Sequence, residues 1–307
     1  MKKFLTTLIL AIAVWCLPTN SNAQIDRNYV HYIGQELISE GKYNEAIDML
    51  NILIRIHNTS ADAYFLRGVA KYNLGDLIGA ESDFTNATQI NSVFTVAYQY
   101  RAITRSLLGN YDDSLADYAT AIDIRPDSEG LFYSRGVTHF LSQQFENAVG
   151  DFSEFIRRKP NNADGYVNRG SCYLMLGDTI NAMDDYNKAV NANIYDPLAY
   201  LRRGSLYLQQ NMYEQAHSDL STTIKLDSLN LAAHFNRAIV NAKEFRLMEA
   251  ISDFDSVIKI DSTNSITYFN RAILRSQIGD YNRALEDYDK VEKLSPHNVL
   301  LYYNRGD

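Results

Sequence analysis

The chain has 307 residues, in which 29 lysines and arginines stand against 37 aspartates and glutamates and give a formal net charge of −8. An acidic composition without a cluster of basic residues argues against non-specific nucleic-acid binding, which depends on Lys and Arg at the phosphates. We therefore expect no nucleic-acid partner.

The N-terminus has the pattern of a signal peptide. Two lysines precede an apolar run over residues 4–17, and small residues at Ser21 and Ala23 fit a cleavage site. The run is shorter than the roughly 20 apolar residues of a membrane-spanning helix. We expect residues 1–23 to be cleaved and the mature chain to be an extracytoplasmic bacterial protein, periplasmic or secreted, without stable membrane insertion. Cleavage leaves Cys172 as the single cysteine, so an intramolecular disulfide is not possible.

Charged residues recur along the rest of the chain at a fixed spacing. The arginines of this series are Arg67, Arg101, Arg135, Arg169, Arg203, Arg237, Arg271 and Arg305. An aspartate follows each of the first seven arginines, always at the same distance in the sequence. These aspartates are Asp83, Asp117, Asp151, Asp185, Asp219, Asp253 and Asp287. No insertion or deletion breaks the register, and an unbroken period in the range of roughly 20–50 residues predicts a repeat architecture.

Counted from Arg27, the register divides the chain into eight full units and a partial ninth unit, residues 299–307. The full units begin at residues 27, 61, 95, 129, 163, 197, 231 and 265. In the second unit, Tyr64 and Gly68 are four residues apart, as are Ala80 and Phe84, and this spacing is typical of helices. A glycine between the two halves is typical of a tight turn. Each unit is therefore expected to form helix, turn, helix, turn, with small residues where the two helices approach.

The order of residue types within the unit resembles the tetratricopeptide repeat. An aromatic residue, a small residue four positions later, a turn glycine, an alanine and a second aromatic residue recur from residue 27 to residue 307. The resemblance implies an all-α solenoid, in which antiparallel helix pairs stack into a right-handed superhelix with a concave groove lined by the first helices. One departure is the arginine at the seventh position, where the family's pattern carries leucine.

The recurring arginines and aspartates are expected to form internal ion pairs and not a ligand site. The first unit lacks both members, because Ile33 and Met49 occupy the two positions. Their joint absence favours a pair within each unit, across its two helices. A pair between each aspartate and the arginine of the next unit, such as Asp83 with Arg101, is also consistent with the sequence, because that separation is equally constant. The choice between the two schemes stays open.

The sequence contains no recognisable catalytic motif. It has no phosphate-binding glycine loop, no HExxH zinc motif and no nucleophile-elbow serine. Its six histidines fall at unrelated positions of the repeat and not at the spacing of metal ligands. We expect a protein that is not an enzyme and that binds neither a cofactor nor a metal ion.

The resemblance assigns the groove to the second, fifth, ninth, twelfth and thirteenth positions of each unit, which are mostly apolar here. Asparagines recur at the sixth position, where they either hydrogen-bond an extended peptide backbone or reflect a residue that is common in the family. Lys243 is the one cation at the groove positions of units two to eight, which argues against a clamp for a terminal carboxylate. The candidate peptide-binding residues are Phe65, Tyr72, Tyr133, Phe140, Met175, Leu208, Phe235, Phe269, Asn168, Asn236, Asn270 and Asn304.

These observations predict a non-catalytic scaffold that binds a peptide or helix of a partner protein in an apolar groove. Alternatively, the solenoid is the recognition arm of a larger protein, truncated at residue 307, with a C-terminal enzymatic, signalling or membrane-anchoring domain. Neither the identity of the partner nor the oligomeric state follows from the sequence.

Overall fold

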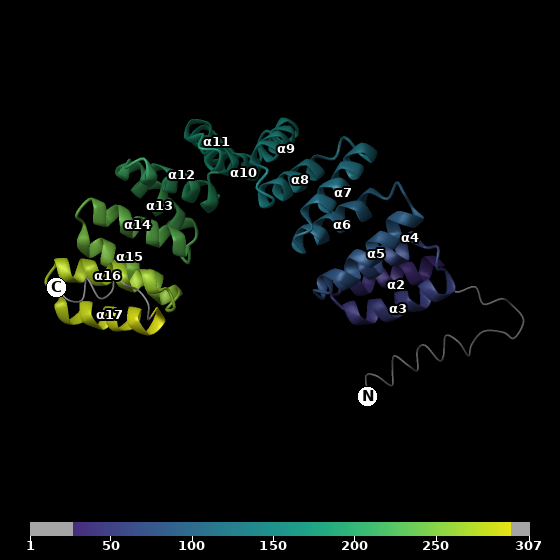
Figure 1. Cartoon of the computed structure of the whole chain (residues 1–307), viewed down its shortest axis with the longest axis horizontal. Helices are drawn as coiled ribbons and strands as arrows, with labels where there is room; N and C mark the ends of the chain where they lie inside the picture. Colours follow the sequence, from purple (N-terminus) through teal and green to yellow (C-terminus); the bar gives the residue numbers. More distant parts are fainter. Residues whose placement is uncertain (1–26, 296–307) are drawn as a thin grey trace, which may run out of the picture. The chain divides into compact units, whose positions relative to one another are not determined.

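The computed structural model describes residues 27–295, which form sixteen helices and no strands. Figure 1 shows these helices, α2 to α17, as successive pairs joined by short turns. Within the described residues, no helix has the length and apolar character needed to cross a membrane. The expected signal peptide, residues 1–23, and the partial ninth unit, residues 299–307 with Asn304, lie outside the described residues.

The chain divides into two compact units, residues 1–131 and residues 132–307. In both, the first helix of each pair begins at the first position of the register and the second helix begins at the seventeenth. The first helices are α2 (Arg27–Ser39), α4 (Ala61–Asn73), α6 (Thr95–Leu107), α8 (Glu129–Leu141), α10 (Ala163–Met175), α12 (Pro197–Gln209), α14 (Leu231–Lys243) and α16 (Ser265–Gln277). The second helices are α3 (Tyr43–Ile56), α5 (Leu77–Ile90), α7 (Tyr111–Ile124), α9 (Phe145–Arg158), α11 (Thr179–Ala192), α13 (Tyr213–Leu226), α15 (Leu247–Ile260) and α17 (Tyr281–Leu294).

The turn between the two helices of a pair passes through one residue in the left-handed conformation. Five pairs place glycine there, as at Gly75 with φ of 81°, because glycine has no Cβ atom to clash. The other three carry Gln143, Asn211 and Phe245, with φ of 62°, 58° and 60°. This conformation costs a residue with a side chain roughly 1–2 kcal/mol, although asparagine adopts it more readily. A phenylalanine at this position is therefore unexpected on backbone grounds.

The small residue at the eighth position allows the two helices of a pair to pack closely. A Cβ atom added to Gly68 would lie 2.6 Å from Cε1 of Phe84, and one added to Gly170 would lie 2.8 Å from Cε1 of Tyr186. Both rings are fully buried. The aromatic ring of the second helix thus fills the space that a side chain on the first helix would occupy.

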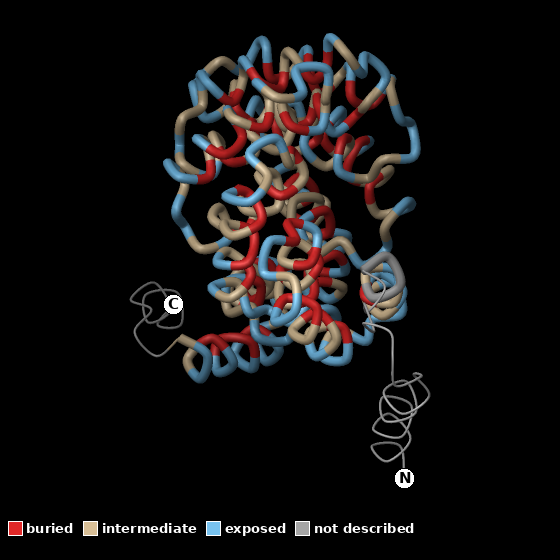
Figure 2. Tube along the Cα trace, turned by 90° about the vertical axis from the view of Figure 1, so that its right-hand side faces the viewer, coloured by how far each residue is buried: buried red, intermediate tan, exposed pale blue. Residues whose placement is uncertain are grey.

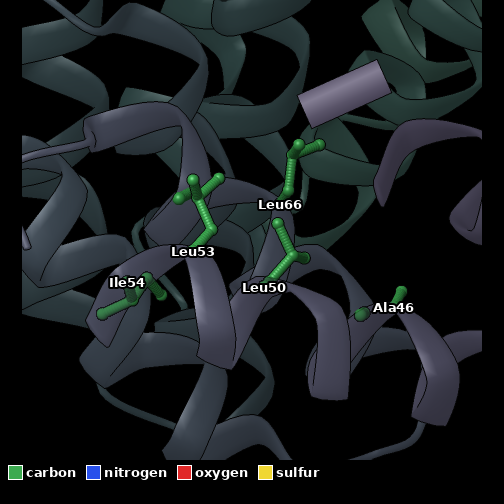
Figure 3. Close-up of a cluster of buried hydrophobic side chains, with 7 residues drawn as sticks. Ala46, Leu50, Leu53, Ile54 and Leu66 are labelled. Carbon is green, nitrogen blue, oxygen red and sulfur yellow. The ribbon is translucent and has the colours of Figure 1, made fainter. Parts of the chain in front are cut away.

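Neighbouring pairs are joined by apolar side chains from both. Leu50 and Leu53 of α3 lie in one buried cluster with Leu66 of α4 (Figure 3). Figure 2 shows buried segments on the facing sides of helices and exposed segments at the turns. Each of the two compact units therefore has a hydrophobic core that continues from one helix pair to the next, which is typical of a solenoid.

Among the described residues, each recurring arginine from Arg67 to Arg271 forms an ion pair with the aspartate of its own helix pair, so the within-unit alternative is the observed one. Arg169 donates from Nε and Nη2 to the two carboxylate oxygens of Asp185, at 2.8 and 2.7 Å. The same two-pronged geometry recurs from Arg67 to Arg271. The seven aspartates are buried. We call each such arginine–aspartate pair a brace, because it joins the two helices of one pair.

In the braces other than that of Arg135, the remaining guanidinium nitrogen, Nη1, donates to a side chain of the preceding helix pair. Nη1 of Arg169 donates to Oγ of Ser153 at 2.9 Å, and Nη1 of Arg203 donates to Oδ1 of Asn187 at 3.0 Å. The guanidinium of Arg169 also lies 5.9 Å from the ring centroid of Tyr166, at the fourth position of its own unit. One side chain therefore connects three helices, which explains why arginine and not lysine recurs here.

Between α10 and α15, the stack is tighter on the side of the first helices. Helix α10 contacts α12, and α12 contacts α14, whereas no comparable contact joins α11 to α13 or α13 to α15. The first helices therefore lie on the inner side of the local curve. We call the surface of α10, α12, α14 and α16, together with α8 from Phe132 onward, the inner face.

Candidate functional site

The aromatic candidates on the inner face are half-buried, and their rings pack against rings of the second helices. The ring centroid of Tyr133 lies 5.0 Å from that of Phe155, and the centroid of Phe235 lies 5.5 Å from that of Phe254. Each ring therefore contributes to the core on one side and leaves only part of its surface to a ligand. The other two candidates pack in the same way, Phe140 against Phe145 and Phe269 against Tyr288.

The two aliphatic candidates differ in exposure. Met175, the last residue of α10, is 58% exposed. Leu208 of α12 is partly buried and packs against the cluster that contains Leu220 and Val240. Met175 is therefore the aliphatic candidate that a ligand reaches most easily.

In residues 27–131, Phe65 and Tyr72 of α4 belong to one aromatic cluster. The centroid of Phe65 lies 5.1 Å from that of Phe94 and 5.4 Å from that of Tyr100. Tyr72 lies 6.2 Å from Tyr100, measured in the same way. Because Tyr100 lies on α6 of the next helix pair and Phe94 directly precedes that helix, the half-buried rings of Phe65 and Tyr72 also hold two pairs together.

The asparagines at the sixth position hydrogen-bond within the protein. Nδ2 of Asn168 donates to Oη of Tyr133 at 3.0 Å and to the backbone oxygen of Asp164 at 2.9 Å. Nδ2 of Asn236 donates to Oγ of Ser205 at 2.9 Å. Tyr133 and Ser205 belong to the preceding helix pairs, so these amide donors connect neighbouring pairs. The Oδ1 atoms of Asn168 and Asn236 accept no hydrogen bond from the residues that the structure describes.

Arg202 occupies the sixth position of α12, between the helices that carry Asn168 and Asn236, and its side chain is exposed. Every other arginine from 132 to 295 lies within ion-pair distance of a carboxylate, whereas Arg202 has no such partner among the described residues. The pKa of Tyr186 is raised, because its hydroxyl is buried. The hydrogen bond with Ser171 and the nearby positive charge of Arg202 offset only part of this rise. The Tyr186 hydroxyl lies 3.2 Å from Oγ of Ser171. We call Asn168, Ser171, Arg202, Ser205 and Asn236 the polar patch.

The polar patch was only partly foreseen from the sequence. Lys243, exposed at the end of α14, is not the one cation on the inner face once the sixth position is included. In the four units from residue 163 to residue 298, the sixth position carries Asn168, Arg202, Asn236 and Asn270. The single arginine among the asparagines was the signal in the sequence that could have indicated the polar patch. Asn270 takes the same position on α16 and is half-buried.

The remaining reactive groups are part of the packing. Cys172 is fully buried, and burial raises the pKa of its thiol to about 12, so the thiol is protonated and inert at neutral pH. Nε2 of His139 lies 3.7 Å from Oδ2 of Asp151, which is itself a brace residue. Within residues 27–295 no group of three or more histidines, cysteines or carboxylates is placed to hold a metal ion.

Family comparison agrees with the observed helix pairs. One tetratricopeptide-repeat model matches residues 107–163, 133–197 and 201–265, which together are more than half of the chain. Two further models of the same repeat match residues 34–75 and 266–298. The chain belongs to the tetratricopeptide-repeat family. No curated protein matches the sequence significantly.

Solved structures of other tetratricopeptide-repeat proteins share the fold. One from Parabacteroides merdae is 16% identical, covers 80% of this chain and 97% of its own, and has a TM-score of 0.60. The C-terminal part of a repeat-containing protein from Cytophaga hutchinsonii is 17% identical, with coverages of 77% and 97% and a TM-score of 0.62. YrrB, described as having an unusual peptide-binding site, is 19% identical, with coverages of 62% and 98% and a TM-score of 0.54. The family and these neighbours support a protein-interaction scaffold.

Proposed function

We propose that the inner face of residues 132–295 binds an extended segment of a partner protein that carries an acidic side chain between apolar ones. The observation that carries this proposal is Arg202, an exposed guanidinium without a carboxylate partner among the described residues, on a face of half-buried aromatic rings. A carboxylate of the partner would pair with this guanidinium through two parallel hydrogen bonds.

The surroundings of Arg202 suit the backbone of such a segment. The Oδ1 atoms of Asn168 and Asn236 offer acceptors for backbone N–H groups on either side. Apolar side chains of the segment would bury against Met175 and the accessible part of Phe235. Because helices and inter-pair hydrogen bonds already hold these groups, little ordering is needed on binding. The description of YrrB offers a precedent for a peptide ligand on this fold.

Selection from a random phage-displayed peptide library tests the proposal. The wild-type protein is expected to enrich peptides with Asp or Glu between apolar residues. Arg202→Glu should weaken the enriched peptides about 10- to 100-fold, because a hydrogen bond to a charged group contributes about 1.5–3 kcal/mol. Isothermal titration of synthetic copies of the enriched peptides measures the change.

Lys225→Glu is the matched control, because it makes the same charge change at an exposed position on the second helix α13. It should leave peptide affinity unchanged, and both variants should unfold within about 0.5 kcal/mol of the wild type. Enrichment without acidic residues, or equal binding by Arg202→Glu, would contradict the proposal. The recognition arm of a larger protein would use the same face, so the experiment applies to that alternative as well.

We also propose that the mature protein acts outside the cytoplasm. The support is the charged, apolar and small-residue pattern of residues 1–23. After expression in a bacterium, N-terminal sequencing of the extracytoplasmic fraction is expected to begin at Gln24. Recovery only from the cytoplasm, with the N-terminal segment intact, would contradict this location.

A further inference from the structure

Phe245 is the most exposed large apolar side chain in residues 31–295, at 87% exposure. It stands at the left-handed turn position between α14 and α15, with φ of 60°. Glycine takes the equivalent position in five other helix pairs. The backbone therefore disfavours phenylalanine here, and the ring buries almost no surface in return. Neither local conformation nor core packing explains this residue.

Further apolar side chains are exposed beside this turn. Met248, in the first turn of α15, is 65% exposed, and Ile278 follows α16 in the next helix pair. Both line one pocket of about 200 Å³ together with Ile251. The rest of its lining is polar and comprises Ser252, Asp255, Arg275, Asp280 and Arg283. The turn that carries Phe245 is therefore continuous in sequence with the wall of an open pocket, whose apolar side is formed by Met248, Ile251 and Ile278.

The turns and the first turns of the second helices form one edge of the stack, because all pairs are stacked in the same orientation. We call this the turn edge and define it as residues 142–147, 176–181, 210–215, 244–249 and 278–283. It carries six carboxylates against two guanidinium groups, and no lysine. The carboxylates are Glu146, Asp178, Glu214, Glu244, Glu249 and Asp280, and the cations are Arg246 and Arg283. Arg246 is paired with Glu244 and Arg283 with Asp280. The carboxylates that remain without a cation partner among the described residues are Glu146, Asp178, Glu214 and Glu249, and they leave the edge acidic.

We propose that the turn edge docks a basic amphipathic helix of a partner protein. The apolar face of that helix would cover Phe245 and insert a side chain into the pocket beside Met248 and Ile278. Its lysines and arginines would face the surrounding carboxylates, which steer a cationic partner and repel an anionic one. A second copy of this chain would bring the same acidic edge against itself, so charge disfavours self-association. This surface lies on the turns and is separate from the inner face.

The test uses a fluorescently labelled amphipathic helical peptide of leucine and lysine, and the same peptide with glutamate in place of lysine. The wild-type protein is expected to bind the basic peptide at least about tenfold more tightly than the acidic one, measured by anisotropy at fixed ionic strength. Phe245→Gly should weaken the basic peptide at least about tenfold. It should also melt at the same temperature or higher, because glycine is the residue that this turn conformation favours.

Asn211→Gly is the matched control, since it makes the same backbone change at the same position of the preceding pair. It should melt at the same temperature or higher, and it should weaken the basic peptide much less than Phe245→Gly does, because it removes no apolar side chain. Arg202→Glu on the inner face should leave binding of the basic peptide intact. The proposal for the inner face and the proposal for the turn edge are therefore tested independently. Equal binding of the basic peptide by Phe245→Gly would overturn the proposal. The proposal would also be overturned if the wild-type protein dimerised in a concentration-dependent way, or bound neutral phosphatidylcholine vesicles, and Phe245→Gly abolished that association.

Discussion

Asp185→Ala is expected to destabilise the protein by about 3–5 kcal/mol, because Arg169 loses both carboxylate oxygens at a site that water barely reaches. Asp185 is 2% exposed, and the side chain of Arg169 is 16% exposed. Most of the decrease in the free energy of unfolding comes from leaving the Arg169 charge buried without a partner, and not from the net stabilisation that the ion pair provides. Urea unfolding followed by circular dichroism measures the change in the free energy of unfolding.

The neighbouring residue provides the control for this measurement. Asp184, which forms an exposed pair with Lys188 one helical turn away, should cost only about 0.3–0.5 kcal/mol when it is replaced by alanine. The double variant Arg169→Met/Asp185→Leu removes both charges and should be more stable than Asp185→Ala by at least about 1 kcal/mol. Equal and small effects at Asp184 and Asp185 would show that the brace is not a buried pair.

Phe84→Ala is expected to cost about 3–5 kcal/mol, because a fully buried ring is lost and the cavity collapses only in part. The ring lies over Gly68, and its centroid lies 5.8 Å from that of Phe65 and 5.7 Å from that of Tyr100. These residues come from three helices, so the loss should loosen two neighbouring pairs. Thermal and urea unfolding both report it.

Two further variants separate this packing effect from general damage to α5. Ile78→Ala removes an exposed side chain from the same helix and should change stability by less than about 0.5 kcal/mol. Gly68→Leu should destabilise the wild type by at least about 1–3 kcal/mol, because its side chain meets the Phe84 ring. In the Phe84→Ala background the same leucine should restore stability, because it fills the vacated space. A leucine that destabilises both backgrounds would contradict the ring-over-glycine packing.

The helix pairs were predictable because the same pattern recurs in every unit. A small residue such as Gly68 and an aromatic residue such as Phe84 keep a constant separation across the turn. Helix periodicity and the turn glycines of five pairs then indicate two helices in each unit. The partner of each arginine was harder to predict, because each aspartate keeps a constant separation both from the arginine of its own unit and from the arginine of the next. Only the observed facing of the two helices selects Asp185 for Arg169.

The surface was less predictable than the fold. The family resemblance placed Phe235 and Tyr133 on the groove side, but it did not indicate how much of each ring neighbouring second helices cover. The sequence left open whether the asparagines at the sixth position hydrogen-bond a peptide or are merely common in the family. In the structure, the donors of Asn168 and Asn236 are used between pairs. The unusual residue at position 245 was present in the sequence, but its near-complete exposure required the structure.

By itself, the sequence determined the period, the alternation of helix and turn within each unit, and the residue types that recur where the two helices meet. Those properties depend on short-range periodicity and on a register that no insertion disturbs. Tertiary structure decided which helix pair each arginine nitrogen contacts and which asparagine side chains donate hydrogen bonds to a neighbouring pair. It also decided that the side chains of Arg202 and Phe245 are exposed. Those properties depend on side-chain rotamers and on contacts between residues about one repeat apart, such as Tyr133 with Asn168, and local patterns carry no record of such contacts.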